Sequence, residues 1–418
     1  MKKVKENNLR KNFFWNIIGL SFYGLVSLFL LIIVKRVNGF KISGIFSYAY
    51  SICTLFYFFA IYYSRPYQLA NYGNNKSFNQ FFSFRIITIV LSLIFIFLFS
   101  LISGFSFFKI EVIMLLMFFR VMDALSESFY GYLQENDNLY EVGISYTLKS
   151  LLGTIVFLII DILTQNVIIS IISLVILSFL VLIFYDYKNY KKIAVKRIQI
   201  DFSNNKLILK ESFSIFIFSF LSIYLANAEK YVMTYTVSDK IQSIFAILIM
   251  PATVLSLVGN YLMMPFMTDL KNLSKEGDYK KFNILSLKIL FVLIVIGIFG
   301  TIVCDFIGIP ILNIIYGIHL NEYKSSLIII IIASIFNAAS SIISGVLTLI
   351  NKNNFQTVFY LLSCICATVL CHNLIKKDAI IGASVSYMIS YLINFVMFII
   401  YYFICIKKLG GIRNEKKS

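Results

Sequence analysis

Runs of about 20 mainly apolar residues recur along this chain, at the length that an α-helix needs to cross the hydrocarbon core of a bilayer. Of its 418 residues, 59% are hydrophobic and 14% are charged, against about 45–50% and about 25% in an ordinary soluble domain. A soluble domain would place its apolar residues at helical or strand spacing, not in unbroken runs. The sequence therefore predicts an all-α integral membrane protein.

We expect about twelve transmembrane helices, and a polar segment in the middle of the chain divides them into six and six. This predicts an N-terminal six-helix lobe (1–185), a basic cytoplasmic linker (186–212) and a C-terminal six-helix lobe (213–418). Two lobes around a central cavity are the plan of transporters that work by alternating access. The spans are predicted at 13–34, 44–63, 84–104, 110–133, 143–163, 166–185, 213–236, 242–267, 284–307, 326–350, 355–375 and 379–406.

The distribution of positive charge predicts the orientation of the chain. With the N-terminus inside, 25 of the 37 lysines and arginines fall on the cytoplasmic side and 8 in outer loops. Arg65, Lys76 and Arg85 are counted in an inner loop. This excess predicts both termini in the cytoplasm. The net charge of +17 is therefore assigned to membrane orientation, and no nucleic-acid partner is expected.

The fourth predicted span carries charges at bilayer depth, where each costs about 2.5–3.5 kcal/mol on insertion scales unless it faces a cavity or a partner. Arg120, Asp123 and Glu127 lie at positions i, i+3 and i+7, so they share one face of the helix. One interpretation is a structural ion pair between Arg120 and Asp123. The alternative is a cavity wall in which Asp123 or Glu127 binds the coupling ion.

The seventh predicted span contains a second polar group, Asn227, Glu229, Lys230 and Tyr231. Lys230 is a candidate contact for an anionic substrate. The alternatives are an ion pair with an acidic side chain, or a lysine stem that extends to the outer interface. Glu229 and Lys230 point about 100° apart on the helix, so they are not obvious partners of each other.

Several classes of site find no support in the sequence. The six cysteines all lie in apolar runs, which indicates packing residues and neither disulfides nor a metal site. No Gly-rich phosphate loop or metalloprotease helix motif is present, and no outer loop is large enough for a catalytic domain. We therefore expect no enzyme activity, no cofactor and no bound metal.

Four short segments resemble the Wzx-type polysaccharide-unit flippases of the multidrug/oligosaccharidyl-lipid/polysaccharide exporter superfamily, and span number and loop lengths extend the resemblance over nearly the whole chain. The segments are Asn12-Phe13-Phe14-Trp15-Asn16-Ile17-Ile18-Gly19, Arg36-Val37-Asn38-Gly39 through Gly44-Ile45-Phe46-Ser47-Tyr48-Ala49, Arg65-Pro66-Tyr67-Gln68, and Asn227 to Tyr231.

The resemblance implies a flippase that moves an undecaprenyl-pyrophosphate-linked oligosaccharide across a bacterial inner membrane for O-antigen or capsule synthesis. It implies a cationic cavity with Arg120 and Lys230 as candidates, beside Asn227 and Tyr231. Asp123, Glu127 and Glu229 become the candidate coupling carboxylates for H⁺ or Na⁺. Membrane lipids, a polysaccharide polymerase and a chain-length regulator are the further partners that this function implies.

Three rival classes were weighed against this interpretation. A multidrug or metabolite cation antiporter of the same superfamily is the first alternative, and its cavity should contain more acidic than basic side chains. A sugar porter should carry a Gly-Asp-Arg-rich loop, which is missing from residues 64–85. A membrane polysaccharide polymerase, which is an enzyme, should carry a large outer loop, whereas the long loop of this chain is predicted inside.

Overall fold

The structure is a computed structural model that describes residues 2–70, 77–194, 197–353 and 355–415, so Lys76, Lys416 and Lys417 lie outside it. The described residues form α-helices with short π- and 3-10 segments, and they contain no strand. The predicted all-α class is therefore confirmed.

The chain divides into two compact units, Met1–Ile223 and Tyr224–Ser418. The first unit contains α1 (Lys2–Ile61), α2 (Ser64–Ala70), α3 (Phe78–Ile102), α4 (Phe107–Glu135), α5 (Leu139–Thr147), the π-helix η1 (Leu148–Leu152), α6 (Gly153–Thr164), α7 (Val167–Val181), the π-helix η2 (Leu182–Tyr187) and α8 (Lys188–Ile193). The unit boundary falls inside α9 (Asn205–Thr236). The second unit contains α10 (Asp239–Met263), η3 (Met264–Phe266), α11 (Met267–Glu276), α12 (Tyr279–Val303), η4 (Cys304–Gly308), α13 (Ile309–Tyr316), η5 (Asn321–Tyr323), α14 (Lys324–Leu349), α15 (Gln356–Ile375) and α16 (Ala379–Glu415).

Ten helical segments within the described residues are long and apolar enough to cross a membrane. The first of them, Lys11–Leu69, contains the first two predicted spans, which are separated at Gly39 by a backbone with φ 81° and ψ −173°. The fourth predicted span is α4, which is 29 residues long and falls outside the ten because its apolar stretch carries charged side chains. Each predicted span therefore coincides with a helix, and the protein is a multi-pass membrane protein.

The surface of the helices fits a lipid environment. On α3, Ile94, Phe95 and Leu98 are between 44% and 47% exposed, whereas the hydroxyl-bearing side chains of Ser83 and Ser92 are fully buried. A helix in lipid must direct its polar groups toward other helices, because the hydrocarbon offers them no hydrogen-bond partner. The polar interior is therefore where a functional site is expected.

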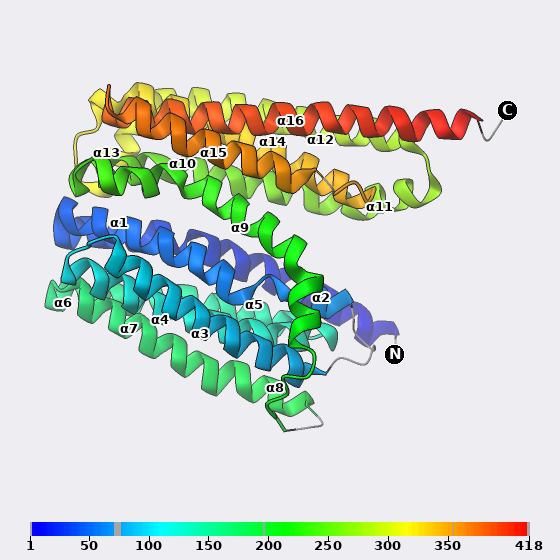
Figure 1. Cartoon of the computed structure of the whole chain (residues 1–418), viewed down its shortest axis with the longest axis horizontal. Helices are drawn as coiled ribbons and strands as arrows, with labels where there is room; N and C mark the ends of the chain where they lie inside the picture. The colour runs from blue at the N-terminus through cyan, green and yellow to red at the C-terminus, as the bar shows by residue number, and fades with distance from the viewer. Residues whose placement is uncertain (1, 71–76, 195–196, 354, 416–418) are drawn as a thin grey trace. The chain divides into compact units, whose positions relative to one another are not determined.

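Within each unit, the segments that were predicted to be cytoplasmic lie at one end. Figure 1 shows the N-terminus, α2 and α8 at one end of the first unit, and the junction of α6 and α7 at the other. In the second unit, the C-terminus and α11 lie at the end opposite α13. Short connections between antiparallel spans produce this alternation, which the charge distribution also predicts.

Helices α1 and α5 touch backbone to backbone at two glycines. A Cβ atom on Gly19 would lie 2.3 Å from the carbonyl oxygen of Gly143, and one on Gly143 would lie 2.2 Å from the carbonyl oxygen of Trp15. Small residues permit such close approach between transmembrane helices. This contact brings the α5 side chains next to those of α1 in the interior of the first unit.

The described parts of the predicted linker belong partly to helices and are partly hydrogen-bonded to α3. Its first residue, Asp186, is 1% exposed in η2, and its last residues belong to α9. In between, the Asp201 amide donates to Ser83 Oγ at 2.7 Å, and Gln80 Nε2 donates to Asp201 Oδ2 at 3.1 Å. Hydrogen bonds from Ser203 to the carboxylate lower the pKa of Asp201. These contacts attach the segment before α9 to the start of α3.

Candidate functional site

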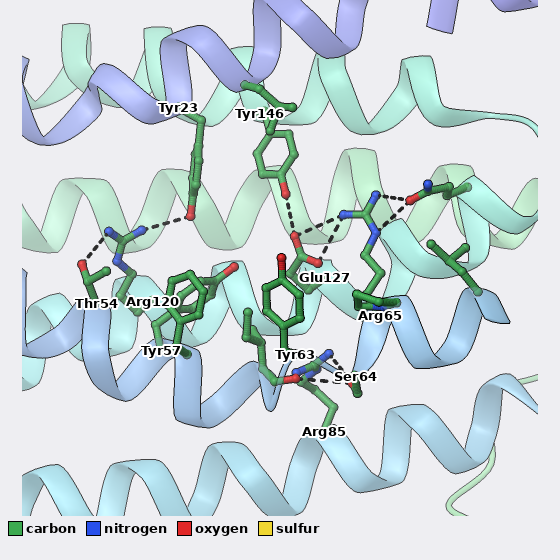
Figure 2. Close-up of a pocket in the computed structure, with 16 residues that line it drawn as sticks. Tyr23, Thr54, Tyr57, Tyr63, Ser64, Arg65, Arg85, Arg120, Glu127 and Tyr146 are labelled. Atoms are coloured by element: carbon green, nitrogen blue, oxygen red, sulfur yellow. Dashed lines mark hydrogen bonds and ion pairs between the residues drawn. The ribbon is translucent and has the colours of Figure 1, made fainter. Parts of the chain in front are cut away.

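A cavity of about 510 Å³ lies inside the first unit, between α1, α2, α3, α4 and α5. Figure 2 shows its polar side chains directed toward one another from these helices. Its charged lining residues are three arginines and one glutamate, and its other polar lining residues are mainly tyrosines. The charged residues are Arg65, Arg85, Arg120 and Glu127, and the tyrosines are Tyr23, Tyr57, Tyr63 and Tyr146.

Glu127 on α4 is bound by two different helices. Arg65 Nη1 on α2 lies 3.3 Å from Glu127 Oε2, and the Tyr146 hydroxyl on α5 donates to Oε1 at 2.5 Å. Arg65 also donates to Gln134 Oε1, from Nε at 3.0 Å and from Nη2 at 2.7 Å. The Arg65 side chain remains 18% exposed. Because it is more exposed than Arg120, whose side chain is 7% exposed, Arg65 is better placed to exchange its present partners for a ligand.

Arg120 lies deeper among aromatic rings. Its Nη1 donates to the Tyr23 hydroxyl at 3.0 Å, its Nη2 donates to Thr54 Oγ1 at 3.1 Å, and its guanidinium carbon lies 4.6 Å from the centre of the Tyr50 ring. Cation–π contact and hydrogen bonds offset part of the cost of burying the charge. Arg120 Nη1 also lies 3.3 Å from Asp123 Oδ2. The ion pair that was one of the two interpretations is present, and Arg120 lines the cavity as well.

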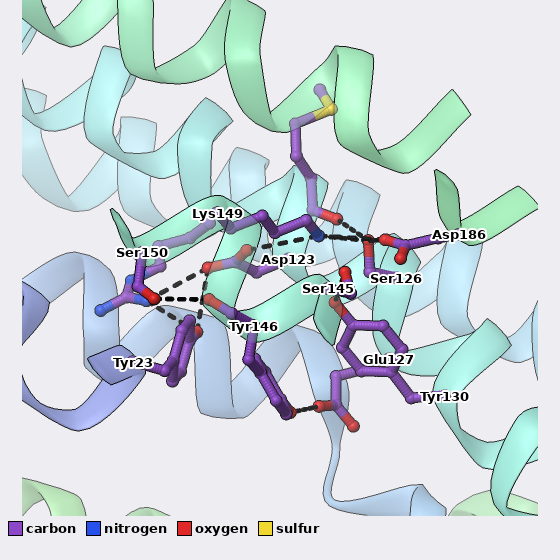
Figure 3. A network of polar contacts seen from close by, with 12 residues as sticks. Tyr23, Asp123, Ser126, Glu127, Tyr130, Ser145, Tyr146, Lys149, Ser150 and Asp186 are labelled. Atoms are coloured by element: carbon purple, nitrogen blue, oxygen red, sulfur yellow. Dashed lines mark hydrogen bonds and ion pairs between the residues drawn. The ribbon is translucent and has the colours of Figure 1, made fainter. Parts of the chain in front are cut away.

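Asp123 connects this pair to a second buried network, shown in Figure 3. The Tyr23 hydroxyl donates to Asp123 Oδ2 at 2.9 Å, and Lys149 Nζ lies 3.7 Å from Oδ1. Lys149 Nζ also lies 3.3 Å from Asp186 Oδ2 and donates to Ser126 Oγ at 2.5 Å. Lys149 belongs to η1 and Asp186 to η2, so both members of the pair lie in π-helical turns. Such turns add a residue to the helix and redirect the side chains around it, often at functional sites.

Arg85 on α3 has no acidic partner among the described residues. Its Nη1 donates to the Ala60 carbonyl at 3.1 Å and its Nη2 donates to Ser64 Oγ at 3.0 Å, while its buried Nε has no hydrogen-bond partner within the described ranges of the chain. With Glu127 as the single lining carboxylate, the charged lining of the cavity is positive overall. This polarity favours an anionic ligand.

The second predicted group lies in the second unit. Lys230 is 8% exposed and its Nζ lies 3.5 Å from Asn227 Oδ1, and the ring of Tyr231 lies 5.4 Å from that of Tyr224. Glu229 is 1% exposed and is directed elsewhere, with Ser386 Oγ donating to its Oε1 at 3.4 Å. Its Oε2 is buried and has no hydrogen-bond partner in the part of the chain that the structure describes.

Two residues of this cavity were wrongly placed from the sequence. Arg65 and Arg85 were counted in an inner loop, but they lie on α2 and α3 and line the cavity. Without them the inner segments still contain 23 lysines and arginines against 8 in the outer loops, so the orientation argument is unchanged. The available signal was Arg65-Pro66-Tyr67-Gln68, one of the four segments on which the family resemblance stood.

Lys149 was missed for a different reason. It stands alone in an apolar run, and a single lysine near a span end is also compatible with a stem that extends to the interface. Its two acidic partners lie 26 residues before and 37 residues after it, so only the packing of α4 against η1 and η2 reveals the network.

Comparison with known proteins agrees with this geometry. No family model matches the sequence. The chain is 24% identical over 402 residues to the capsular polysaccharide biosynthesis protein CapF of Staphylococcus aureus, across 94% of this chain and 98% of that protein.

Three solved structures resemble the fold. The lipid II flippase MurJ in an inward closed conformation matches with a TM-score of 0.69 and 15% identity, over 92% of this chain and 86% of that chain. An inward-facing multidrug resistance MATE family transporter of the MOP superfamily matches with a TM-score of 0.67 and 13% identity, over 95% and 99%. A MOP superfamily transporter from Pyrococcus furiosus, whose binding pocket is described as having reverse polarity, matches with a TM-score of 0.59 and 13% identity, over 97% and 96%.

The resemblance expected from the sequence is thus confirmed by a relative in capsular polysaccharide biosynthesis and by the MATE and MurJ structures, and the chain is a multi-pass membrane protein with the fold of the MOP exporter superfamily.

Proposed function

We propose that this protein is a flippase that moves an undecaprenyl-pyrophosphate-linked oligosaccharide repeat unit from the cytoplasmic to the outer leaflet of a bacterial inner membrane. The observation that carries the proposal is the cationic cavity, with three arginines and one glutamate, in a chain similar to a capsular polysaccharide biosynthesis protein. That relative favours a capsule-type polymer over O-antigen as the destination of the repeat unit.

The substrate class follows from charge. A pyrophosphate cannot cross hydrocarbon unaided, because an unpaired charge at the bilayer centre is costly. Arg65 and Arg120 offer planar guanidinium groups, which bind phosphate oxygens in pairs. Moving negative charge out of an inside-negative cell releases about 2.3 kcal/mol per charge per 100 mV, so the membrane potential assists this direction.

Tyrosines are the proposed contacts for the sugar. Tyr23, Tyr57, Tyr63 and Tyr146 line the cavity around the arginines, and an aromatic ring with a hydroxyl offers an apolar face and a hydrogen-bonding edge. In the second unit, Lys230, Asn227 and Tyr231 remain proposed substrate contacts, because Lys230 and Tyr231 are buried and the half-buried Asn227 lies 3.5 Å from Lys230.

Coupling is proposed to act through Glu127. Arg65 Nη1 lies 3.3 Å from Glu127 Oε2, so an anion that enters the cavity and binds Arg65 interacts with the same guanidinium as the Glu127 carboxylate. A phosphate that binds Arg65 competes with Glu127 for the same guanidinium, so binding of the substrate and the charge environment of Glu127 are linked. Asp123 and Glu229 are the further candidate coupling groups, and Glu229 has one buried carboxylate oxygen without a partner in the described residues.

The cation antiporter is the second function class, and the polarity of the cavity argues against it. A cationic drug would meet Arg65, Arg85 and Arg120, with Glu127 already bound by Arg65 and Tyr146. Like charges without an intervening acid repel, so a net positive cavity should exclude such substrates. Both termini are proposed to lie in the cytoplasm, because the basic excess on that side persists after the correction of Arg65 and Arg85.

The test is a strain in which this protein is the sole flippase for one surface polysaccharide. We expect deletion to abolish full-length surface polymer, and Arg65→Gln and Arg120→Gln to reduce it about tenfold or more, the effect of losing ~1.4 kcal/mol of interaction. Lys281→Gln is the matched control, because that lysine side chain is 74% exposed. Unchanged polymer in the deletion strain, with no second flippase present, would overturn the proposal. Resistance to cationic dyes that depends on the protein, with unchanged polymer, would establish the antiporter instead.

A further inference from the structure

The turn between α1 and α2 has an unusual backbone. Tyr62 and Tyr63 have φ values of 46° and 44°, so two consecutive tyrosines occupy the left-handed region. That region brings Cβ of an L-residue close to its own carbonyl oxygen, and glycine, asparagine and aspartate are the residues that usually adopt it. Such a conformation persists only where the surrounding structure enforces it. Arg65 follows two residues later.

The side chains of α3 fix one side of this turn. Arg85 Nη1 and Thr88 Oγ1 donate to the Ala60 carbonyl at 3.1 and 2.6 Å, and Arg85 Nη2 donates to Ser64 Oγ at 3.0 Å. A carbonyl at the end of a helix has no partner within the helix, and lipid supplies none. Arg85 therefore binds the chain on both sides of the two tyrosines, at Ala60 and at Ser64.

Helix α9 fixes the other side. The rings of Tyr62 and Phe216 stack with centroids 4.2 Å apart and an angle of 13°, and the Tyr62 hydroxyl donates to the Leu209 carbonyl at 3.4 Å. Tyr62 also packs edge to face on Phe84, with centroids 5.4 Å apart. Tyr62 and Phe216 are 5% and 7% exposed. Tyr62 is thus enclosed between α3 and the first half of α9, whereas Tyr63 is 37% exposed.

We propose that the Tyr62–Tyr63 turn couples α9 to the cavity: stacking of Phe216 on Tyr62 keeps the turn left-handed, and the turn places Arg65 against Glu127. Arg85 and Tyr62 are positioning residues for Arg65 in this scheme. Phe216 and Tyr62 both belong to the first unit, so a displacement of the first half of α9 within that unit separates Phe216 from Tyr62. The turn then relaxes toward right-handed backbone and Arg65 leaves Glu127. The cavity charge is in this way coupled to the position of the first half of α9.

The role of this coupling rests on the proposed function, but its test needs no substrate. Leu69 lines the cavity one helical turn after Arg65. In the test, Leu69 is replaced by cysteine in the full-length protein, whose six native cysteines are changed to alanine. The quantity measured is the rate at which a water-soluble maleimide labels the new cysteine. Phe216→Ala should raise this rate about tenfold, equivalent to a shift of ~1.4 kcal/mol in the equilibrium between the left-handed and the relaxed conformation of the turn. Phe213→Ala is the matched control, because Phe213 lies on the same helix and is 50% exposed.

A rescue experiment isolates the backbone conformation. Added to Phe216→Ala, Tyr63→Asn should return the rate to within about twofold of the parent, because asparagine tolerates left-handed backbone. Tyr63→Ala removes the same ring without that tolerance and should not rescue. A rate for Phe216→Ala within about twofold of the parent, or equal rescue by alanine and asparagine, overturns the proposal. If Phe216→Ala is not monodisperse, Phe216→Leu, which keeps apolar volume and loses the stacking, should raise the rate in the same direction, and an unchanged rate there counts against it equally.

Discussion

Replacing Lys149 by methionine should be among the most destabilising single changes in the first unit. Lys149 Nζ lies 3.3 Å from Asp186 and 3.7 Å from Asp123, and its side chain is 2% exposed. At an effective dielectric constant of ~20, these distances correspond to attractions of about 5 and about 4 kcal/mol before desolvation is subtracted. Removing one partner of a buried pair typically costs about 3–5 kcal/mol, because it leaves an uncompensated charge. We expect a loss in that range for Lys149→Met.

The measurement is the free energy of unfolding of the purified protein in mixed detergent, titrated with a denaturing detergent. Lys149→Met combined with Asp186→Asn should recover at least about 2 kcal/mol relative to the sum of the single changes, because the uncompensated carboxylate is gone and Asp123 keeps Tyr23 and Arg120. Lys281→Met is the control: its pair with Asp278 has a similar distance of 3.2 Å, but the lysine side chain is 74% exposed, so a change below about 1 kcal/mol is expected. A loss of less than about 1 kcal/mol for Lys149→Met, or additive single changes, would refute the reasoning.

Three further predictions follow from single contacts. Gly143→Ala places a Cβ 2.2 Å from the Trp15 carbonyl oxygen and should lower the free energy of unfolding by about 1–3 kcal/mol. Gly300→Ala, whose nearest contact is at 4.0 Å, should be close to neutral, and equal effects of the two changes would contradict the backbone contact of α1 and α5. Tyr146→Phe removes the 2.5 Å hydrogen bond to Glu127 and should lower the free energy of unfolding by about 1.5–3 kcal/mol in the same assay. Tyr235→Phe, at a 56% exposed tyrosine, is its control, and an unchanged stability of Tyr146→Phe would show that the bond does not stabilise the protein. Because hydrogen bonds lower the pKa of Asp201, its contribution to stability is present above the unfolded-state pKa and is lost as pH falls through the lowered value. The stability difference between the parent and Asp201→Asn should therefore shrink between about pH 5 and about pH 3. A difference that stays constant over this range would contradict the prediction.

The sequence predicted the helices well, and it predicted the charged face of α4. Apolar runs of span length determine a transmembrane helix locally, because lipid forces each helix to satisfy its own backbone hydrogen bonds. Arg120, Asp123 and Glu127 could be placed on one face because their spacing fixes their direction. The first two predicted spans lie largely in one long helix, α1, which is interrupted at Gly39 and ends at the Tyr62–Tyr63 turn.

Apart from the Arg120–Asp123 pair, the partners of those charges could not be predicted. Arg65 was assigned to a loop because it follows an apolar run, and nothing local signals that the left-handed turn at Tyr62 and Tyr63 is followed by a helix that places Arg65 in the cavity lining. Lys149 and Asp186 gave no motif, because their contacts join helices that are distant in sequence.

By itself, then, the sequence determined that the chain belongs in a membrane, where its helices fall along the chain, and that Arg120, Asp123 and Glu127 share one face of α4, since each of these depends on neighbouring residues and on periodicity. Only the tertiary structure decided that Arg65, Arg85 and Arg120 converge on one cavity with a single glutamate, and that Lys149 joins Asp123 to Asp186. The physical reason is that ion pairs form over a few ångströms in space, whereas the chain separates their members by up to 62 residues.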